Sequence, residues 1–560
     1  MAAVHKLQVL PKAFTGALSV TVSGERCAGC QECVVRCPTG ALQIATDEWV
    51  AQADVALCVG CRQCERTCPF GAIAVKGPVC VGESSRPWRP TRATIYHDIR
   101  ETRPGFATLE QAQYEAERCL SCPDPTCVLG CPAHNDIPAF IAAVRAGDLD
   151  EAQTVLRRTT VLPDICSRVC DQSSQCEGAC SLHLAGADAV AIGLIERFIT
   201  DASPVPPVRE PVRTPARTRE ASVAIVGSGP AGIGAAWRLI EAGVQVTMYE
   251  RSETAGGVPN WGIPEFTLPG AVAQRPIEAL LAAGLDLRLG TSVDTREELA
   301  HTAEQHAAVL LAHGASAPLG LRVPGVELPW VHDATTFLQM GRRALRERTD
   351  LETVCAGSRM LVVGAGNTAM DVARTALRLG AKVTAVDWMD RRFARVRPDE
   401  LHEAEEEGVE VSFCRSVLRF EESVSGNRSA VLGVTEQRRP DRPPRVTSRP
   451  TERVQFLDCA VLAMGYRVER LDLGIGALPS PASPPRYPDR TWLGSGLLWN
   501  RSAPVGQLAQ EREANLRAVR QPFADKVYVI GDARTGPATV VAAMAQGSAA
   551  ARELLDRLGK

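Results

Sequence analysis

Residues 222–250 read SVAIVGSGPAGIGAAWRLIEAGVQVTMYE, and they decide the fold of the larger part of the chain. An apolar strand runs into the turn Gly227-Ser228-Gly229-Pro230-Ala231-Gly232, a helical pattern follows, and a second strand ends at Glu250. This order is the fingerprint of a dinucleotide-binding βαβ unit. The glycines let backbone amides approach a pyrophosphate at the positive end of the helix, and the acid accepts a hydrogen bond from a ribose hydroxyl.

A second copy of this pattern begins at Met360. Its strand leads into Gly364-Ala365-Gly366-Asn367-Thr368-Ala369, then a helix, then a strand that ends at Asp387. The acid follows the first glycine by 23 residues in both copies (250 − 227 and 387 − 364). A single glycine-rich turn is weak support, but two complete units predict an α/β protein with two dinucleotide sites. Near the end of the chain, strand 527–530 leads into Gly531-Asp532, a turn at which two-dinucleotide flavoproteins bind the ribityl chain.

Upstream, sixteen of the 20 cysteines form two arrays that end before residue 181. The first array is Cys27-x2-Cys30-x2-Cys33-x3-Cys37-Pro38 followed by Cys58-x2-Cys61-x2-Cys64-x3-Cys68-Pro69. The second is Cys119-x2-Cys122-x4-Cys127-x3-Cys131-Pro132 followed by Cys166-x3-Cys170-x5-Cys176-x3-Cys180. Thiolates at such spacings hold iron–sulfur clusters.

Zinc and disulfides are the alternatives. Paired C-x-x-C motifs also bind zinc, but a run closed by Cys-Pro is typical of a [4Fe–4S] site. The chain is also far larger than disulfide-stapled domains. Because the closing cysteine of each run crosses to the other cluster, we expect Cys27, Cys30, Cys33 and Cys68 to hold one cluster. Cys58, Cys61, Cys64 and Cys37 are then expected to hold the other.

Composition narrows the class of protein. The chain is 45% hydrophobic and 23% charged, its formal net charge is −3, and its 560 residues predict roughly four domains. The lack of a long basic run argues against nucleic acid as a partner. No apolar stretch approaches the roughly 18 residues of a membrane-spanning helix. The amino terminus lacks a secretory signal, so a cytoplasmic location is expected.

Residues 20–80 resemble the bacterial two-cluster ferredoxins. Residues 108–560 contain the segments Arg118–Cys122, Cys127–Pro132, Arg168–Cys170, Cys176–Cys180, Gly256–Phe266 and Glu405–Gly408. With these motifs, this part of the chain resembles the small subunit of bacterial glutamate synthase. It is also similar to the amino-terminal half of dihydropyrimidine dehydrogenase and to the large subunit of NADH-dependent ferredoxin:NADP oxidoreductase.

The resemblance implies a multidomain fold: an α+β two-cluster ferredoxin at 1–82, a linker and helical cluster domain at 83–215, and an α/β flavoprotein. The flavoprotein would divide into FAD-binding parts at 216–345 and 471–560 and an NAD(P)-binding domain at 346–470. Prolines at 83–107 and 201–220 mark the linkers. The charged stretch Glu403–Glu407 is interpreted as a solvated helix face without function.

The resemblance also implies site residues. FAD would contact the first glycine turn (Gly227 to Gly232) and Glu250, Arg251, Gly257, Val258, Gly262, Ile263, Gly314, Gly531, Asp532, Thr539 and Val540. The nicotinamide nucleotide would contact Gly364, Gly366, Asn367, Thr368, Asp387, Trp388 and Gly465. Cys119, Cys122, Cys127 and Cys180 would hold a third [4Fe–4S] cluster, and Cys131, Cys170 and Cys176 a fourth, completed by Glu196 where relatives place Gln or Glu.

Two details of that site are open. Glu196 is alternatively an ordinary helix glutamate, and Cys166 is left without a role. Cys80, Cys355, Cys414 and Cys459 are expected to be small buried hydrophobic residues. Relatives that use NADPH read Val-Tyr-Arg-Arg where this chain reads Val386-Asp387-Trp388-Met389, so Asp387 predicts a preference for NAD(H), with Arg391 and Arg392 as the residues that would oppose it.

The expected function is an NAD(P)H:ferredoxin-type oxidoreductase. It would be the electron-transfer subunit of a hetero-oligomer, passing electrons between a nicotinamide, FAD and four [4Fe–4S] clusters to or from a partner such as a 2-oxoacid:ferredoxin oxidoreductase. No catalytic acid or base is expected, since hydride transfer needs mainly alignment. No barrel for glutamate synthesis or pyrimidine reduction is expected after Asp532. The alternatives are a flavin-based bifurcating subunit, a glutamate-synthase-type small subunit, and a non-enzymatic redox-sensing or assembly subunit.

Overall fold

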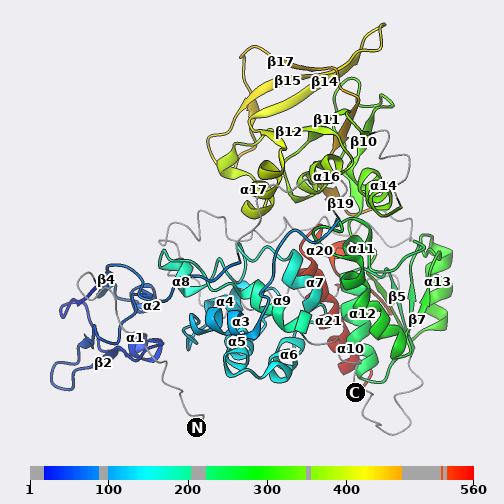
Figure 1. The fold of residues 1–560 in the computed structure, drawn as a ribbon. Coiled ribbons are helices and arrows are strands. Elements are labelled where there is room, and N and C mark those ends of the chain that lie inside the picture. The colour runs from blue at the N-terminus through cyan, green and yellow to red at the C-terminus, as the bar shows by residue number, and fades with distance from the viewer. Residues whose placement is uncertain are drawn as a thin grey trace.

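A computed structural model describes residues 18–87, 99–202, 222–347, 355–469 and 526–559, together with the backbone of a short strand at 519–520. Residues 88–98 of the first expected linker, residues 203–220 of the second and most of the expected carboxyl-terminal FAD part before residue 526 lie outside the described residues. Figure 1 shows a small amino-terminal lobe, a helical region beside it, and two lobes built around sheets.

The amino-terminal lobe repeats a simple pattern twice: a cysteine loop, a short helix and a strand. Its elements are β1 (Ser19–Val22), α1 (Glu32–Val35), β2 (Leu42–Ile44), β3 (Ala51–Ala53), α2 (Gln63–Thr67) and β4 (Ile73–Lys76). β1 pairs antiparallel with β4, and β2 with β3. A small core that includes Leu18, Leu42 and Ile73 fills the space between the two cysteine loops.

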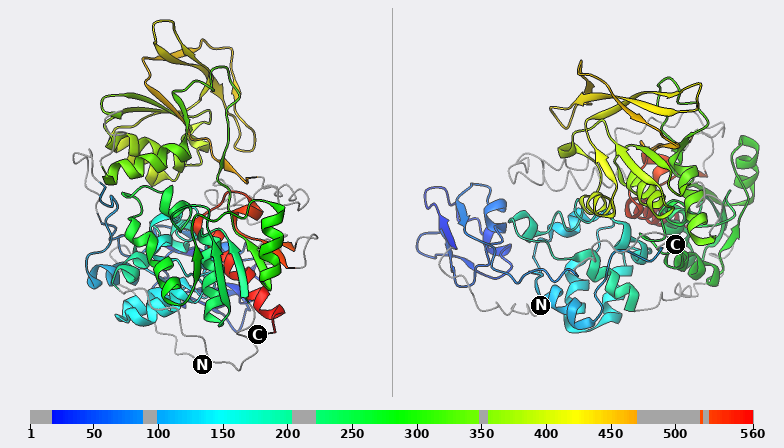
Figure 2. Two further views of the ribbon diagram at one scale, coloured as in Figure 1. Left: turned by 90° about the vertical axis from the view of Figure 1, so that its right-hand side faces the viewer. Right: turned by 45° about the horizontal axis from the view of Figure 1, so that its top comes forward.

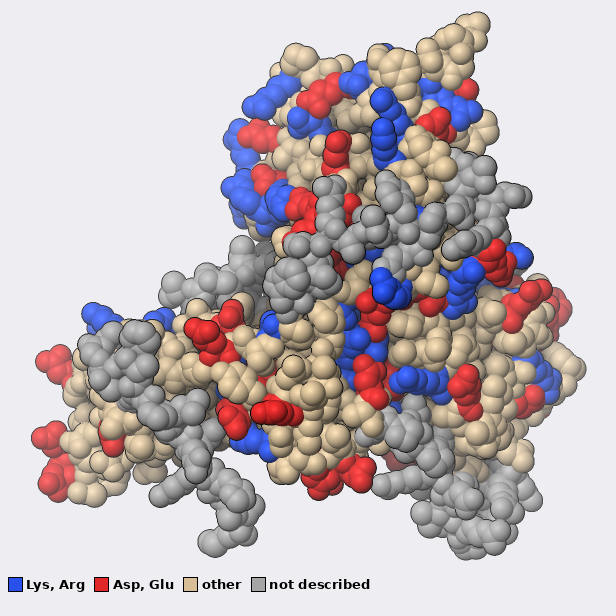
Figure 3. All heavy atoms as spheres, viewed as in Figure 1, with Lys and Arg blue, Asp and Glu red and all other residues tan. Residues whose placement is uncertain are grey.

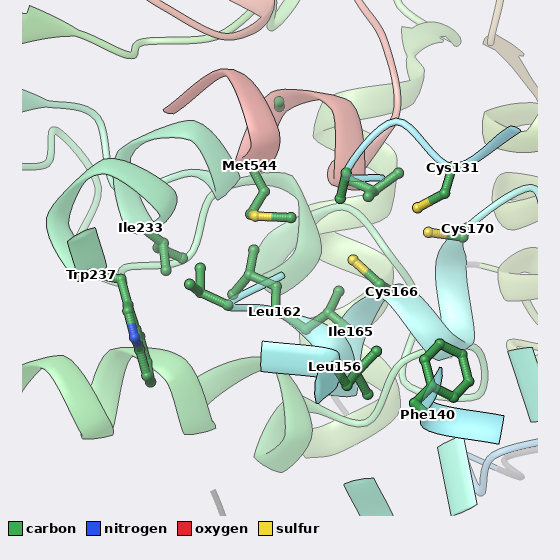
Figure 4. Close-up of a cluster of buried hydrophobic side chains, with 14 of the residues drawn as sticks. Cys131, Phe140, Leu156, Leu162, Ile165, Cys166, Cys170, Ile233, Trp237 and Met544 are labelled. Atoms are coloured by element: carbon green, nitrogen blue, oxygen red, sulfur yellow. The ribbon is translucent and has the colours of Figure 1, made fainter. Parts of the chain in front are cut away.

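The second array lies among helices, as expected. They are α3 (Leu109–Glu117), α4 (Thr126–Gly130), α5 (Ile137–Ala146), α6 (Leu149–Arg157), α7 (Pro163–Val169), α8 (Ser181–Leu184) and α9 (Ile192–Ala202). Thr108, Asp136 and Asp148 cap α3, α5 and α6 by accepting backbone N–H bonds, which satisfies donors that the first helical turn leaves free. The core of these helices continues into the next lobe through Leu162, Ile233 and Met544 (Figure 4).

The first glycine turn belongs to a six-stranded sheet of order β20-β21-β8-β5-β6-β7. The strands are β5 (Ser222–Val226), β6 (Gln245–Tyr249), β7 (Asp286–Arg288), β8 (Ala308–Leu311), β20 (Val519–Arg520) and β21 (Val527–Val529). Its helices are α10 (Pro230–Glu241), α11 (Val258–Trp261), α12 (Gly270–Ala282), α13 (Arg296–Gln305), α20 (Asp532–Thr535) and α21 (Val540–Arg557). β21 pairs with β8, so the carboxyl-terminal strand joins the sheet of the first glycine turn.

The second glycine turn belongs to a parallel sheet of order β10-β18-β11-β12-β13. Its elements are β10 (Val331–Asp333), α14 (Ala334–Glu347), β11 (Arg359–Val363), α16 (Asn367–Arg378), β12 (Lys382–Val386), α17 (Pro398–Glu407), β13 (Glu410–Ser412) and β18 (Cys459–Leu462). The division expected between residues 345 and 346 falls inside α14. The second lobe begins before it, because β10 pairs with β18 of that lobe.

An antiparallel extension lies on the outer side of this lobe (Figure 2). It comprises β14 (Arg415–Glu422), β15 (Arg428–Glu436), β16 (Arg445–Val446) and β17 (Glu452–Gln455). The two sheet lobes are joined by the short pair β9 (Ala317–Pro318) and β19 (Tyr466–Arg467). None of the helices in the described ranges has the length and apolar character needed to cross a membrane.

The interpretation of Glu403–Glu407 as a solvated face is wrong. Glu403 is buried, and Glu407 accepts hydrogen bonds of 2.8–2.9 Å from both Arg374 and Arg378, whose side chains are fully buried. Burial alone would raise the pKa of Glu407, but the two arginines lower it to about 2. Only Glu405 and Glu406 of this stretch pair with partly exposed side chains. The reason is tertiary: α16 places two arginines under α17, which the local sequence does not reveal.

Candidate cofactor sites

The structure gathers the first cysteine array into the two expected sets. Cys27, Cys30, Cys33 and Cys68 form the first set: burial raises the pKa of Cys33, and the other three thiols raise it further. Cys37, Cys58, Cys61 and Cys64 form the second set: burial raises the pKa of Cys64 to about 12, and the other three thiols add to that shift. The crossing of Cys37 and Cys68 between halves is therefore present in the fold.

The third set consists of Cys119, Cys122, Cys127 and Cys180. Burial raises the pKa of Cys127, and its neighbours Cys119, Cys180 and Cys122 raise it further. A cavity is lined by all four of these cysteines. A similar cavity is lined by the second set.

These cavities fit a cluster better than a single ion. Among the described residues, no group of three or more His, Cys, Asp or Glu side chains is arranged to hold one metal ion. A zinc ion draws its thiolates to about 2.3 Å from one point, whereas a [4Fe–4S] cluster keeps four thiolates apart around its own volume. Within each set, neighbouring thiols raise one another's pKa values. Metal binding would act in the opposite direction, because metals bind the deprotonated thiolate.

The fourth set combines Cys131, Cys170 and Cys176 with Glu196. Burial and Glu177 raise the pKa of Cys176, and Cys131 and Glu196 are further neighbours that raise it. Glu196 lies on α9 and is buried, and its Oε1 atom has no hydrogen-bond partner. Burial, with Asp164 nearby, raises the pKa of Glu196 to about 8. A buried carboxylate oxygen without a partner is costly, so this geometry fits a ligand of a bound group.

Cys166 lies at the edge of the fourth set. Its thiol contacts that of Cys170, and this hydrogen bond and burial both raise the pKa of Cys170. Figure 4 shows the Cys131 and Cys170 sulfurs close together, with Cys166 one helical turn away on α7. Outside the arrays, Cys355 is buried as expected, whereas Cys80, Cys414 and Cys459 are only partly buried.

The second, third and fourth sets follow one another toward the flavoprotein lobes. The thiols of Cys61 in the second set and Cys122 in the third are neighbours, since Cys61 helps to raise the pKa of Cys122 after burial and Cys119. Cys127 of the third set is likewise a neighbour of Cys176 of the fourth. Next to Cys176, Gln175 Nε2 donates to Thr539 Oγ1 at 3.4 Å, and Thr539 caps α21.

The first glycine turn is packed against the end of β8. Gly227 has φ +105°, and a Cβ built there would lie 2.4 Å from Ala312 O, so only glycine fits. Glu250 holds the same turn: its Oε2 accepts from Ser228 N at 3.0 Å and from Ser228 Oγ at 2.6 Å. Gly257 also approaches this turn, because a Cβ there would lie 2.8 Å from Gly229 Cα. Val258, Gly262 and Ile263 follow on α11 and its end.

Asp532 faces the same turn from the carboxyl-terminal segment. A Cβ at the preceding Gly531 would meet Ala231 Cβ at 2.5 Å, which brings Asp532 to the start of α10. Asp532 Oδ2 accepts from Ala538 N at 3.2 Å, whereas Oδ1 is buried without a partner. Burial raises the pKa of Asp532 to about 6. An unpaired carboxylate oxygen beside the glycine turn fits a ligand that brings hydroxyl donors, as the ribityl chain of FAD does.

His313 is a residue of this site that the sequence analysis missed. It follows β8, and its Cα lies 3.1 Å from a Cβ built at Gly227. Both of its ring nitrogens are buried without partners, and burial lowers its pKa to about 4. The sequence offered one signal for it: His313 lies between an apolar strand and Gly314, which is itself a predicted FAD contact. Beside it, Arg251 is partly exposed and pairs with Glu469 at 2.8 Å.

The second glycine turn repeats this geometry. Gly364 has φ +118°, and a Cβ there would lie 2.4 Å from Ala463 O. Asp387 Oδ2 accepts from Ala365 N, and Oδ1 from Met389 N, both at 2.7 Å. Gly366 precedes α16, where Asn367 accepts from Arg397 N at 2.8 Å. Thr368 follows in α16, and Gly465 lies after β18 with φ +103°.

The side chains that would decide between NAD and NADP lie around Asp387. Trp388 is 48% exposed and free to cover a base. Arg391 makes a bidentate pair with Glu405 at 2.6 and 2.8 Å, and Arg392 pairs with Asp390. Both arginines are thus engaged by carboxylates of their own lobe.

Three family models match the chain. One described as a 4Fe-4S dicluster domain matches residues 19–69, and one described as dihydropyrimidine dehydrogenase domain II, 4Fe-4S cluster, matches residues 96–205. The third, pyridine nucleotide-disulphide oxidoreductase, matches residues 221–474.

Similar proteins include the putative oxidoreductase AegA of Escherichia coli (strain K12), which is 31% identical over 97% of this chain and 87% of AegA. The glutamate synthase (NADPH) small chain of Halomonas elongata is 32% identical over 84% of this chain and 94% of that protein. Among solved structures, Mycobacterium tuberculosis FprA in complex with NADPH is 19% identical over 61% of this chain and 85% of that chain, with a TM-score of 0.45.

These matches support FAD, a nicotinamide nucleotide and [4Fe–4S] clusters as cofactors, in agreement with the cysteine sets and the two glycine turns. The chain belongs to the glutamate synthase small-chain-like family of FAD- and NAD(P)-dependent iron–sulfur oxidoreductases.

Proposed function

We propose that this protein is an NAD(H)-dependent electron-transfer subunit that exchanges single electrons with a partner redox enzyme of the ferredoxin-dependent class. The observation that supports the proposal is the series from the second set to Thr539, in which the second set neighbours the third, the third neighbours the fourth, and Gln175 beside the fourth contacts Thr539. When bound, FAD would accept a hydride from the nicotinamide, and four clusters would carry single electrons.

Each residue group has a positioning role. We propose that the turn at Gly227, with Glu250 and Asp532, holds FAD, and that the turn at Gly364 holds the nicotinamide nucleotide. The four sets would each hold one [4Fe–4S] cluster, with Glu196 as the non-cysteine ligand of the fourth and Cys166 unligated. The amino-terminal lobe is assigned to residues 1–82 and the helical cluster domain to 83–215, with β10 and α14 added to the nicotinamide lobe.

We further propose that the nucleotide is NAD(H). A carboxylate at Asp387 would accept hydrogen bonds from the ribose hydroxyls and would repel a 2′-phosphate. The supporting observation is that Arg391 pairs with Glu405 and Arg392 with Asp390, so a 2′-phosphate would have to compete with a carboxylate for each arginine.

A second candidate is a glutamate-synthase-type small subunit, favoured by the match to 94% of the Halomonas elongata small chain. The two candidates share the flavin and cluster chemistry and differ in the partner. NADH or NADPH, added with glutamine and 2-oxoglutarate to the reconstituted chain and a separately purified glutamate synthase large subunit, would test it: nucleotide oxidation that requires both substrates favours this candidate.

The primary proposal is tested with the full chain, reconstituted anaerobically with iron, sulfide and FAD. We expect it to oxidise NADH with a viologen dye as acceptor, two dye molecules being reduced for each NADH because the dye takes one electron. A protein that carries its full iron and flavin but reduces no dye with either nucleotide would instead be the non-catalytic redox-sensing or assembly subunit.

A further inference from the structure

The amino-terminal lobe projects from the rest of the molecule, and its inner side is fixed (Figure 1). Gln63 Nε2 donates to Asp124 O at 3.1 Å, and Arg36 pairs with the Asp124 carboxylate at 3.0 Å. Val59 and Cys61 belong to the same hydrophobic core as the helical region. The second set therefore lies on the side of the lobe that packs against the helical region.

The first set includes a cysteine that reaches the surface. All 20 cysteines are in the described part of the chain, and Cys30 is the one that is exposed. Trp49 stands beside it, because a Cβ built at Gly29 would meet Trp49 O at 2.5 Å and Trp49 Cβ at 3.4 Å. The backbone next to Trp49 also contacts this set, since Ala51 N donates to Cys27 Sγ at 3.4 Å.

Trp49 is held outward by the turn between β2 and β3. Its side chain is 64% exposed, and its φ of +53° lies in the left-handed region, which is uncommon for a bulky residue. The bond from Trp49 N to Ala45 O (2.9 Å) and the bond from Ala45 N to Val50 O (2.9 Å) maintain this conformation. Such strain costs on the order of 1 kcal/mol or more and persists mainly at functional positions. Tryptophan is also among the residues that most often anchor protein interfaces.

The surroundings of this aromatic side chain are mainly acidic. Glu25, Asp47 and Glu48 are exposed on the two loops that flank it, and Arg26 is the exposed base on the same loops. Figure 3 shows acidic side chains along the outer edge of this lobe. A patch with an apolar centre and an acidic border is complementary to a protein with a basic face.

We propose that the tip surface, formed by Ala28, Cys30 and Trp49 and bordered by Glu25, Asp47 and Glu48, is where the redox partner docks. The partner is a protein with a basic face around a one-electron centre. This inference rests on the electron-transfer function proposed above and names the partner's chemistry. Oxidation of one NADH to NAD⁺ and H⁺ releases two electrons, so two partner molecules are reduced, or one partner is reduced twice.

The test uses the full reconstituted chain and mitochondrial cytochrome c, a basic one-electron haem protein, as the probe. One variant, Trp49→Asn, removes the aromatic ring and keeps a residue that tolerates positive φ. A second, Asp47→Lys with Glu48→Lys, reverses the acidic border. The matched control, Glu436→Lys with Asp441→Lys, makes the same change in net charge on exposed positions of the nicotinamide lobe.

We expect the rate constant for cytochrome c reduction at low salt to fall about tenfold or more in the Asp47/Glu48 variant and to lose its dependence on salt. Trp49→Asn should weaken the binding of cytochrome c, whereas the reduction rate constant should still depend on salt concentration. Carbodiimide cross-links between the wild-type chain and cytochrome c lysines should map to Glu25, Asp47 or Glu48. Iron content and viologen reduction should stay unchanged in every variant.

Equal losses in the control variant, or cross-links confined to other lobes, would overturn the docking site. An absence of viologen reduction in the wild-type chain is a different failure: it would remove the proposed function, while the cross-link positions would still decide the docking surface.

Discussion

Glu250 and Asp387 hold the two glycine turns in the same way. One carboxylate oxygen of each accepts from the backbone N–H of the residue after the first glycine, Ser228 at 3.0 Å and Ala365 at 2.7 Å. The other oxygen accepts from the N–H two residues after the acid, at 2.9 Å for Glu250 and 2.7 Å for Asp387. The units differ in one bond: Ser228 Oγ also donates to Glu250, whereas Ala365 offers nothing to Asp387. Asp387 therefore accepts one hydrogen bond fewer from its own turn and can accept more from the ribose hydroxyls of a nucleotide.

The first prediction follows from that capacity. Asp387→Asn should lower kcat/KM for NADH and raise the NADPH-to-NADH ratio of kcat/KM by about tenfold, equivalent to about 1.4 kcal/mol, because the charge that repels a 2′-phosphate is lost. Steady-state viologen reduction with both nucleotides measures it. Glu250→Gln is the control: it should reduce FAD retention and leave the ratio unchanged. A wild-type enzyme that prefers NADPH, or an unchanged ratio in Asp387→Asn, would show that Asp387 is not the selector.

The second prediction concerns iron content. Four sets imply about 16 iron atoms per wild-type chain. Cys170→Ser should lose about four of them, whereas Cys166→Ser should keep all, although the two thiols are in contact. Glu196→Ala should shift the spectrum and potential of one cluster, or remove it, without affecting the flavin. Iron analysis and electron paramagnetic resonance measure this, and loss of iron in Cys166→Ser but not in Glu196→Ala would exchange their roles.

Local spacing explains which parts of this structure could be predicted. The cysteine runs and glycine turns are contiguous, so the two sets of the first array, both βαβ units and the Gly531-Asp532 turn could be located from the sequence. The third and fourth sets were implied only by the family resemblance. The features that were missed depend on distant partners. β10 joins a strand more than a hundred residues away, at Cys459–Leu462. In the sequence, Glu407 belongs to a charged stretch that is typical of an exposed helix face. In the fold it pairs with Arg374 and Arg378, which come from another helix. His313 carries no motif of its own, and its unpaired ring nitrogens become visible only in the fold.

The third prediction tests that buried network. Glu407→Gln removes the carboxylate shared by the buried Arg374 and Arg378, although Glu400 and Glu403 still pair with Arg374. Breaking a buried ion pair typically costs about 3–5 kcal/mol. The control, Glu405→Gln, removes an exposed pair with Arg391 and should cost less than about 1 kcal/mol. Thermal unfolding at pH 7 should show a clear decrease in apparent Tm for the first variant only.

The same network predicts a pH dependence. Since the pKa of Glu407 is lowered to about 2, its contribution to the stability of the fold is fully present above its usual pKa of 4.5 and is lost as the pH falls through about 2. Similar Tm values for the two variants would mean that the network contributes little.

The last prediction concerns Asp532 in the flavin-free protein. Burial raises its pKa from 3.8 to about 6, so the folded chain binds this proton more tightly than the unfolded chain does. The stability linked to Asp532 is therefore fully present below the unfolded pKa of 3.8, is lost as the pH rises through about 6, and stays low above that.

Asp532→Asn removes the charge and keeps the shape. The flavin-free variant should match the flavin-free wild type at about pH 3.5 and exceed its Tm at pH 7.5. Its FAD affinity should fall about tenfold or more, because hydrogen bonds to a charged acceptor are the stronger ones. Thermal unfolding at the two pH values and fluorescence titration with FAD measure both effects. A Tm difference that does not change with pH would mean that Asp532 does not carry the raised pKa, and unchanged FAD affinity would mean that its unpaired Oδ1 does not face the flavin.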